Sequence, residues 1–590
     1  MLPPSFRPHA RRCNSLPVIT IKTAGWDRSI EFSPGRTLRE ILDSTAFRVR
    51  SGCRGTGACG LCRVKIKADE LAEPNQVERI HLSEEQIAAG ERLACQVIPL
   101  SRLEVSLLGR EPVPSWRALP PHSYASQSFS CNLEAGASPA RKLPKCQGEP
   151  YGVAVDLGTT HISVTFHNFT TGQWFAGRRG LNPQGTYGSD VMTRLIAADE
   201  SQEAAQDLRK LAVDAIGSAI MDIATCEGIG SDQVARVVIV GNTAMLALMS
   251  GRNSHQLLKP AYWTSLIDCI PEYPTELRSD WAIHPEALIE VLQPLAGFVG
   301  SDLLAGVFAA RLTEKAPGTL LVDFGTNSEL ALWDGQSLWV TSAAGGPAFE
   351  GCGINCGTSG GPGAIYRVKL SSENAASAKL RADPGASNSK PAGSILHHGA
   401  SPDFEFLTID DAPPKGLCGS GIVDLVACLL RSGKLTNIGR FSAEVPNEMV
   451  VLLNGDQRPL VLTKRDVDIF QRAKAAIFAA VKVLLSKASM KPGEIQRIFV
   501  GGAFGHFLDV ESATAIGLLP DLRGNAIELF GNTALRGCEE LLMSDNSAEV
   551  MEALRGSAKL VNLAQCSEFE DFFLEGLYLR RWTDCNEGRR

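Results

Sequence analysis

The chain has 590 residues, 44% of them hydrophobic, and a formal net charge of −7. This length predicts about three or four domains with sizeable cores, and the negative charge argues against nucleic acid or an anionic membrane surface as a partner. The first 16 residues contain no apolar segment and no apolar run elsewhere is long enough to span a bilayer, so we expect no membrane association and a cytoplasmic location.

The first predicted elements are two short strands and a helix. Val18–Lys22 alternates apolar and polar residues as a strand does, and Glu31 and Phe32 lie in a second strand. Thr37 is placed to cap a short helix that runs to Leu42. These elements lead directly into the most informative segment of the sequence.

A glycine-rich loop carries three cysteines, Cys53, Cys59 and Cys62, and a fourth, Cys95, arrives after a long return. Four thiolates in this spacing suit a [2Fe–2S] cluster, and the small residues between them allow the loop to curl and direct backbone N–H groups at the cluster sulfurs. Structural zinc is the main alternative, although only Cys59 and Cys62 form the C-x-x-C pair that zinc sites usually contain twice. The remaining cysteines are scattered, which is typical of buried thiols in a reducing compartment.

The same loop also matches a dinucleotide-binding fingerprint, Gly55-x-Gly-x-x-Gly60, but that motif must open a helix. A strand-like segment, Arg63–Lys67, follows instead, so we discard the fingerprint. A capping box at Ser83 and a closing strand over residues 104–108 complete the pattern. Residues 17–108 resemble a β-grasp ferredoxin that holds a [2Fe–2S] cluster.

Two segments are rich in proline or small residues and lack periodicity. Residues 109–149 predict a linker with at most a helical turn of its own, and residues 371–401 predict a mobile surface insertion. The linker separates the ferredoxin-like region from the rest of the chain.

A weak internal repeat follows the linker. Tyr151–Thr160 is a strand that enters a glycine turn, and Ile162–Phe169 is a second strand that ends in a hairpin. The same order returns at Thr319–Asn327 and Ser328–Trp333, with a hairpin turn at Asp334-Gly335. The repeat predicts two lobes that begin alike.

Each copy of the repeat places an acidic residue at a strand end, Asp156 in the first and Asp323 in the second, followed by a Gly-Thr turn. Glycine allows backbone N–H groups to approach phosphate oxygens, and an aspartate can hold Mg²⁺ or its waters. A helix over residues 463–487 and a strand that runs into a glycine-rich turn, Gln496–Gly505, complete the second lobe.

This arrangement resembles the actin, sugar-kinase and Hsp70-type ATPases, in which two ribonuclease-H-like lobes clamp a nucleotide. The resemblance implies ATP with Mg²⁺ as a cofactor and Asp156 and Asp323 as catalytic residues. It implies two phosphate loops and a turn near adenosine, formed by Gly158, Thr159, Thr160, Gly325, Thr326 and Asn327, and by Gly501, Gly502 and Gly505.

The whole combination resembles the reductive activators of corrinoid proteins, in their [2Fe–2S] branch. The predicted fold class is multidomain α+β and α/β: a β-grasp ferredoxin over 17–108, a linker over 109–149, and ATPase-like lobes over 150–315 and 316–580. Motifs shared with that family include Asn182-Pro-Gln-Gly, Gly241-Asn-Thr, Gly300-Ser-Asp302, Asp323-Phe-Gly-Thr-Asn-Ser-Glu329, Gly346-Pro-Ala-Phe-Glu-Gly351, Cys418-Gly-Ser-Gly-Ile422 and Gly502-Ala-Phe-Gly505.

The resemblance implies that the protein returns a partner corrinoid protein of a methyltransferase system from Co(II) to Co(I), with ATP-dependent electron transfer. No Asp-x-His-x-x-Gly motif for cobalt ligation and no flavin or NAD module is found, so we expect the corrinoid on a partner and electrons from an external ferredoxin or reductase. The oligomeric state is open, with a homodimer as one alternative. Two other functions stay open: activation of another low-potential metalloenzyme, and a redox-gated nucleotide-binding protein without hydrolysis.

Several further residues are ambiguous. Cys352 and Cys356 could form a metal pair or redox switch, and ordinary thiols are the plainer interpretation, as for Cys418. His506 is expected beside the adenosine-like turn. Asp302 and Glu329 are candidates for the cleft between the lobes, and His397-His398 falls in the predicted insertion.

Overall fold

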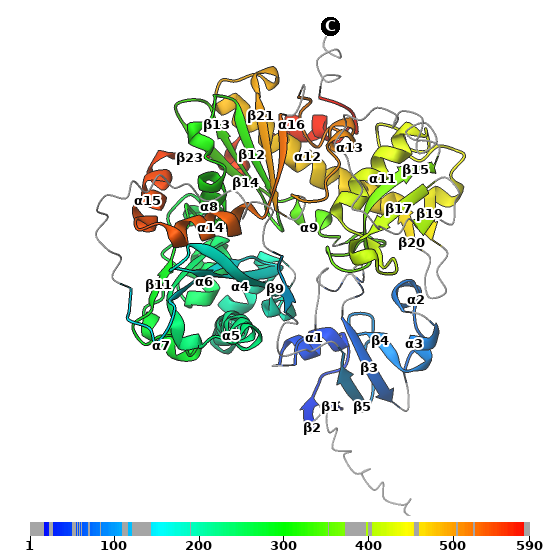
Figure 1. Ribbon diagram of the computed structural model, residues 1–590. Helices are drawn as coiled ribbons and strands as arrows, with labels where there is room; N and C mark the ends of the chain where they lie inside the picture. Colours follow the sequence, from blue (N-terminus) through cyan, green and yellow to red (C-terminus); the bar gives the residue numbers. More distant parts are fainter. Residues whose placement is uncertain are drawn as a thin grey trace, which may run out of the picture. The chain divides into compact units, whose positions relative to one another are not determined.

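The computed structural model divides into two compact units, Met1–Glu111 and Pro112–Arg590, which we call the N-terminal and C-terminal units (Figure 1). Within the described residues, no helix is both long and apolar enough to cross a membrane. The described residues are 17–22, 27–45, 47–49, 55, 57, 60, 62–68, 71–82, 84–108, 116–120, 143–188, 190–351, 353–371, 397–398, 404–453, 460–502, 505–522 and 526–582.

The N-terminal unit is built on a five-stranded sheet in the order β2-β1-β5-β3-β4. Alternation in β1 directs Ile19 and Ile21 into a core that Leu38 of α1 covers from one side. Thr37 and Glu40 form the capping box that begins α1, so the predicted helix start is confirmed. The elements are β1 Val18–Lys22, β2 Asp27–Glu31, α1 Leu38–Asp43, β3 Arg63–Ala68, α2 Gln76–His81, α3 Glu84–Ala88, β4 Glu91–Leu93 and β5 Leu103–Leu107.

The C-terminal unit contains two six-stranded sheets with matching topology. In the first, β7 pairs in parallel with β10 and antiparallel with β8, and the order is β11-β10-β7-β8-β9-β6. In the second, β12 pairs in parallel with β21 and antiparallel with β13, and the order is β22-β21-β12-β13-β14-β23. The predicted internal repeat is therefore confirmed strand by strand.

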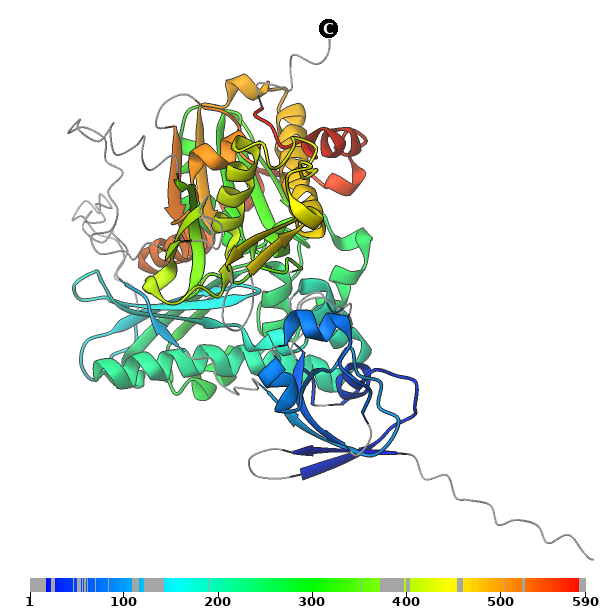
Figure 2. The same cartoon turned by 90° about the vertical axis from the view of Figure 1, so that its right-hand side faces the viewer.

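Figure 2 shows the cyan strands of the first sheet, β7, β8 and β9, below the green and orange strands of the second sheet. The first sheet is formed by β6 Arg117–Ala118, β7 Tyr151–Leu157, β8 His161–Asn168, β9 Gln173–Leu181, β10 Val234–Gly241 and β11 Leu288–Val291. The second is formed by β12 Thr319–Phe324, β13 Ser328–Trp333, β14 Leu338–Ala343, β21 Arg497–Gly502, β22 Ile527–Gly531 and β23 Ala558–Leu560.

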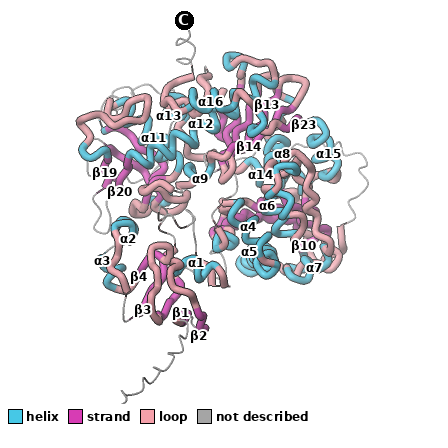
Figure 3. Tube along the Cα trace, turned by 180° about the vertical axis from the view of Figure 1, so that it is seen from behind, coloured by secondary structure: helices cyan, strands magenta, loops and turns pink. Residues whose placement is uncertain are grey.

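Helices cover the first sheet and fill the space between the two sheets. Every residue of β10 is buried, as expected for a parallel strand covered on both faces. Figure 3 shows α4, α5, α6 and α7 grouped near β10, and Figure 1 shows α8 and α14 between the sheets. These helices are α4 Val191–Glu200, α5 Gln202–Glu227, α6 Thr243–Ser250, α7 Pro274–Asp280, α8 Ser301–Ala309 and α14 Thr533–Met543.

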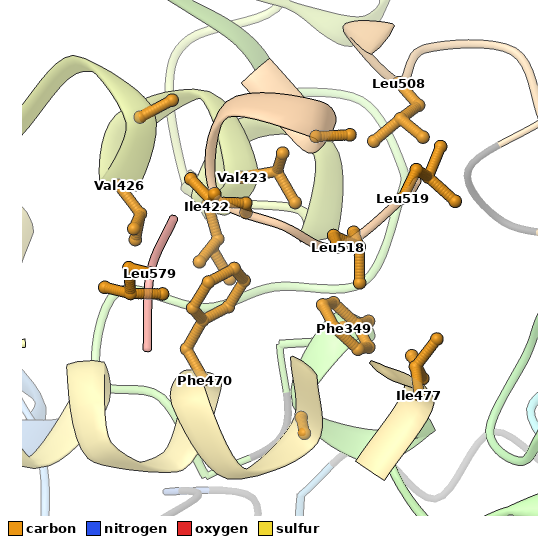
Figure 4. Close-up of a cluster of buried hydrophobic side chains, with 14 of the residues drawn as sticks. Phe349, Ile422, Val423, Val426, Phe470, Ile477, Leu508, Leu518, Leu519 and Leu579 are labelled. Carbon is orange, nitrogen blue, oxygen red and sulfur yellow. The ribbon is translucent and has the colours of Figure 1, made fainter. Parts of the chain in front are cut away.

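The second lobe has a further core of its own, in which Phe349, Ile422, Phe470 and Leu518 meet (Figure 4). The predicted helix over residues 463–487 is confirmed as α12, and its apolar stripe lies in this core. The elements around it are α9 Gly346–Phe349, β15 Ala364–Leu370, β16 His397–His398, β17 Phe404–Thr408, β18 Gly416–Leu417, α11 Gly419–Arg431, β19 Met449–Leu453, β20 Leu460–Thr463, α12 Lys464–Lys487, α13 Val510–Ala515 and α16 Phe569–Gly576. Helix α15 Ser547–Ser557 packs instead against α8.

The predicted linker contains a strand where at most a helical turn was expected. Arg117 and Ala118 form β6, which adds to the edge of the first sheet. Trp116 donates from Nε1 to Ser218 Oγ (2.9 Å), and the Leu119 N–H donates to the Gly177 carbonyl (2.9 Å). Two apolar residues on either side of this short segment gain burial by docking, which offsets the loss of chain freedom.

Other differences from the predictions are small or fall outside the described residues. Phe32 lies just beyond β2, and the closing strand begins at Leu103, shifts that are ordinary at element ends. Ser83 and most of the predicted insertion, residues 372–396 and 399–401, lie outside the described residues, whereas His397 and His398 pair with β17.

Candidate nucleotide cleft and cluster loop

Two of the four candidate cluster cysteines, Cys62 and Cys95, are described, and both are buried in the N-terminal unit. The Ala94 N–H donates to the Cys62 carbonyl (2.8 Å), which holds the two cysteine segments side by side. Gln96 Nε2 donates to Cys95 Sγ (3.3 Å). Cys53 and Cys59 lie outside the described residues.

The three described glycines of the loop occupy positions that no other residue could take without displacing a neighbour. Gly55, Gly57 and Gly60 all have positive φ, and a Cβ at Gly55 would lie 2.7 Å from Arg39 Nη1 and 3.8 Å from Cys95 Cβ. The loop backbone therefore approaches Cys95 closely. A tight glycine cradle beside buried cysteines and an amide donor to sulfur are features that fit a [2Fe–2S] cluster.

In the C-terminal unit, a cavity of about 210 Å³ lies where the glycine turns of the two sheets meet. Asp156 and Asp323 end equivalent strands, β7 and β12, and both line it. Seven of the predicted nucleotide-loop residues line the cavity as well: Gly158, Thr159, Thr160, Gly325, Thr326, Asn327 and Gly502. The structure thus brings together residues from both copies of the repeat.

The start of α14 connects the two aspartates. Asn532 Nδ2 donates to Asp156 Oδ2 (2.7 Å), and the Thr533 hydroxyl donates to the Asp323 carboxylate. Asn532 also caps α14 by accepting the Leu535 N–H (2.9 Å). One helix terminus, which carries partial positive charge, therefore contacts acidic residues from both sheets.

A second connection joins the two phosphate-loop candidates directly. The hydroxyls of Thr160 and Thr326 lie 2.9 Å apart, and each donates to Glu350 Oε2 at 2.8 Å. Glu350 follows α9 of the second lobe, whereas Thr160 belongs to the first. This triad holds the loops of the two lobes in register.

Carboxylates around the cavity are buried close to one another. Burial and the charge of Asp156 raise the pKa of Asp302 to about 7, and burial, with Asp156 again adding to it, raises the pKa of Asp323 to about 6. Burial and the nearby Asp302 raise the pKa of Glu329 well above its ordinary value, and burial raises the pKa of Glu350. The cavity therefore has an excess of acidic groups that cations would stabilise.

Magnesium bound with nucleotide phosphates fits this donor set. Among the described residues, no three His, Cys, Asp or Glu side chains gather closely enough to hold a metal ion by themselves. Mg²⁺ keeps several waters and is usually bound through one or two carboxylates together with substrate phosphates. Asp156 and Asp323 are the candidates for those carboxylates.

The turn that is predicted to lie near adenosine begins directly beside Asp323. Gly501 and Gly502 pair with Asp323 and Phe324 on the neighbouring strand, and a Cβ at Gly502 would lie 2.5 Å from Asp323 Oδ1. Gly505 packs against Gly531 and does not line the cavity. The adenosine role of these glycines stays a prediction.

Of the ambiguous residues, Asp302, Glu329, His506 and Cys418 line the cavity. Cys356 is buried, and burial raises its pKa far above the ordinary range, as expected for an ordinary thiol. Cys352 lies outside the described residues.

Sequence reasoning assigned no site role to four residues in or beside the cavity: Arg179, Glu350, Asn532 and Thr533. A signal for two of them existed, because the tripeptide Gly-Asn-Thr after β10, at Gly241, returns at Gly531. Arg179 lies within a strand that shows no motif. Glu350 stood in a family motif, but no role was assigned to it.

Family models match three segments of the chain, in the order in which these features occur. The model of a 2Fe-2S iron-sulfur cluster binding domain matches residues 21–100, and the RACo middle region matches residues 151–315. The C-terminal domain of RACo, described as the ASKHA domain, matches residues 318–586. The chain belongs to the RACo family.

Membership of the RACo family confirms the predicted family resemblance and fold class, a ferredoxin domain joined to an actin-like ASKHA region. It also confirms the predicted cofactors, a [2Fe–2S] cluster and ATP with Mg²⁺. The residues that hold them stay predictions.

Two curated relatives and one solved structure are similar to this RACo-family chain. The corrinoid activation enzyme RamQ of Eubacterium limosum is 27% identical over 444 residues, which cover 72% of this chain and 69% of RamQ. The [Co(II) methylated amine-specific corrinoid protein] reductase of Methanosarcina barkeri is 28% identical over 297 residues, about half of each chain (48% and 50%). The solved structure of a reductive activator for a corrinoid, iron-sulfur protein shares the fold, with a TM-score of 0.62, 23% identity, and coverage of 97% of this chain and 100% of that one.

Proposed function

We propose that this protein is an ATP-dependent reductive activator that transfers single electrons to Co(II) of a partner corrinoid protein and so restores Co(I) for methyl transfer. Residues 17–108 form the electron-transfer domain in this proposal, residues 109–149 connect it, and residues 150–315 and 316–580 form the two nucleotide-binding lobes. The observation that carries the proposal is the presence, on one RACo-family chain, of a cysteine-bearing glycine cradle and a two-lobed acidic cavity.

Cys53, Cys59, Cys62 and Cys95 would hold the [2Fe–2S] cluster, which supplies one electron at a time at a low potential, about −400 mV in plant-type ferredoxins. The chain's own contribution is to bury Cys62 and Cys95 and to donate a hydrogen bond from Gln96 to Cys95. An external ferredoxin or reductase is the proposed electron source.

ATP would supply the coupling that a thermodynamically uphill reduction needs, because each 59 mV or so of unfavourable one-electron potential costs about tenfold in equilibrium. Asp156 and Asp323 would bind Mg²⁺ and the glycine turns would bind phosphate. Since the α14 terminus and the Glu350 triad link both lobes, a nucleotide that contacts both loops favours one arrangement of the lobes. The corrinoid partner senses that arrangement through its differential affinity for the two states.

The test is an anaerobic reduction assay. Dithionite-reduced protein is mixed with a Co(II) corrinoid protein, with and without Mg-ATP, and the visible spectrum is followed. We expect Co(I) to form in an ATP-dependent manner and to be lost in Cys59→Ser and in Asp323→Ala. An intact cluster spectrum without any cobalt reduction would contradict the proposed client, and equal yields of Co(I) with and without ATP would contradict the coupling.

A further inference from the structure

Arg179 places a guanidinium against the nucleotide cavity without a role in the account above. It lies on β9 and lines the cavity with both glycine turns. Its Nε is fully buried and, among the described residues, has no hydrogen-bond partner. The carboxylates of Asp156 and Glu350 supply negative charge that partly compensates it. A partly buried cation that keeps an unused donor can bind a further anion.

The neighbouring arginine on the same strand behaves differently. Arg178 forms ion pairs with Asp222 and with Glu227 (3.6 Å). Because successive side chains of a strand point to opposite faces, Arg178 and Arg179 have opposite surroundings. The hydrogen-bonding capacity of Arg178 is used within the fold, whereas that of Arg179 is directed to the cavity.

A third arginine lies directly opposite Arg179 on the adjacent strand. Arg117 of β6 is its register partner in the antiparallel pair. Like charges directly opposite each other destabilise a strand pair. Burial lowers the pKa of both Arg179 and His161, and the charge of Arg117 adds to each shift. Arg117 also reaches the loop of the second lobe, because a Cβ at Gly361 would lie 3.5 Å from its Nη1. Arg117 does not line the cavity itself, but Gly360, the neighbour of Gly361, does, so the Arg117 guanidinium lies close to the edge of the cavity.

We propose that Arg179 and Arg117 bind the outermost phosphate of the nucleotide, and that this binding holds strand β6 on β9. This inference rests on nucleotide binding in the proposed function. Phosphate suits the pair, because guanidinium forks bind its oxygens through two parallel hydrogen bonds. A dianionic group between the two arginines replaces their repulsion by attraction.

The position of β6 in the chain gives this binding a consequence. The last strand of the N-terminal unit ends at Leu107 and β6 begins at Arg117, so a short tether joins the two units. By linkage, a phosphate that binds more tightly when β6 is docked also favours docking of β6 to the same extent. The outermost phosphate of ATP, which ADP lacks, therefore anchors the tether of the electron-transfer domain.

The first test compares nucleotides on the full-length protein with Mg²⁺, by calorimetry. A non-hydrolysable ATP analogue and ADP are the two probes. Loss of a charged hydrogen-bond donor predicts that Arg179→Gln binds the analogue about 10- to 100-fold more weakly, with ADP affinity changed less than about threefold. Arg117→Gln, at an exposed position, should show a smaller loss in the same direction. Arg178→Gln is the matched control and should keep the wild-type preference between the two probes.

The second readout is amide hydrogen exchange of the peptide that contains residues 116–120. In the wild-type chain the analogue should slow exchange of the Leu119 N–H more than ADP does, and Arg117→Gln should abolish that difference. Arg179→Lys, which keeps the positive charge, should retain part of the difference in exchange between the analogue and ADP.

The outcomes distinguish phosphate binding by the two arginines from nucleotide binding as such. Nucleotide binding with unchanged discrimination in Arg179→Gln, or equal protection of residues 116–120 by both probes, would overturn the assignment and leave the proposed function intact. A wild-type chain that binds neither nucleotide would refute the proposed function, and the assignment with it.

Discussion

Glu78 holds the segment that carries the fourth cysteine, and its replacement by glutamine should release the cluster at lower temperature. Its carboxylate accepts two hydrogen bonds from Arg92, from Nε at 2.8 Å and from Nη2 at 2.7 Å, and a third from the Leu93 N–H at 3.0 Å. The Glu78 and Arg92 side chains are only 1% and 6% exposed. Cys95 follows two residues after Leu93.

The magnitude follows from the burial of the pair. Removal of one partner of a buried ion pair costs about 3–5 kcal/mol, because the other charge is left without compensation. In a domain of this size each kcal/mol lowers the midpoint by about 4–8 °C, so Glu78→Gln should lower the midpoint of the N-terminal unit by at least about 12 °C.

The assay is anaerobic heating of the full-length protein while cluster absorption and tryptophan fluorescence are recorded. In Glu78→Gln the midpoint temperature of cluster loss should fall, and the midpoint temperature of unfolding of the C-terminal unit should not change. Glu84→Gln is the matched control, because the Arg79–Glu84 pair (3.0 Å) is exposed, at 47% and 81%, and should change the midpoint little. A shift for Glu78→Gln no larger than that of Glu84→Gln would refute the argument.

Three further predictions concern the C-terminal unit. Gly502→Ala should weaken binding of a fluorescent ATP analogue by tenfold or more, because φ is +74° and a Cβ would lie 2.3 Å from a carbonyl oxygen of the adjacent strand; unchanged affinity would contradict this. Glu350→Gln should slow ATP hydrolysis about 10- to 100-fold without weakening ATP binding, because it loosens Thr160 and Thr326 while removing a negative charge beside the phosphates; steady-state kcat and KM separate the two effects. Burial raises the pKa of Asp424 to about 7, so the native state binds an extra proton between the unfolded value near 4 and pH 7, and the contribution of Asp424 to stability falls as pH rises through that window. Asp424→Asn should therefore flatten the pH dependence of the midpoint between about pH 4 and 7, and parallel curves for the two proteins would argue against this.

Features that depend on residues close together in the chain could be predicted from the sequence. The capping box of Thr37 and Glu40 fixes the start of α1 within four residues, and the strand-turn repeat around Asp156 and Asp323 predicted two lobes that begin alike. Such signals depend on backbone propensity and alternation, which neighbouring residues determine.

Contacts between segments that are distant in the chain could not be predicted from the sequence. Asn532 and Asp156 are 376 positions apart, and no local pattern connects the α14 terminus to β7. β6 has only two residues, too few to show alternation, and it forms because the preformed edge of β9 offers hydrogen bonds and because Trp116 finds a partner in Ser218. Arg179 is an ordinary strand residue until the fold places it in the cavity.

A single-turnover measurement tests the central claim most directly. The protein is reduced anaerobically, excess reductant is removed, and an equal amount of Co(II) corrinoid protein is added with or without Mg-ATP while the electron paramagnetic resonance spectrum is recorded. Reduced [2Fe–2S] and Co(II) are both paramagnetic, and oxidised [2Fe–2S] and Co(I) give no signal. The account predicts that, with ATP, both signals are lost in equal amounts, one electron for each cobalt; persistence of both signals with ATP would contradict it.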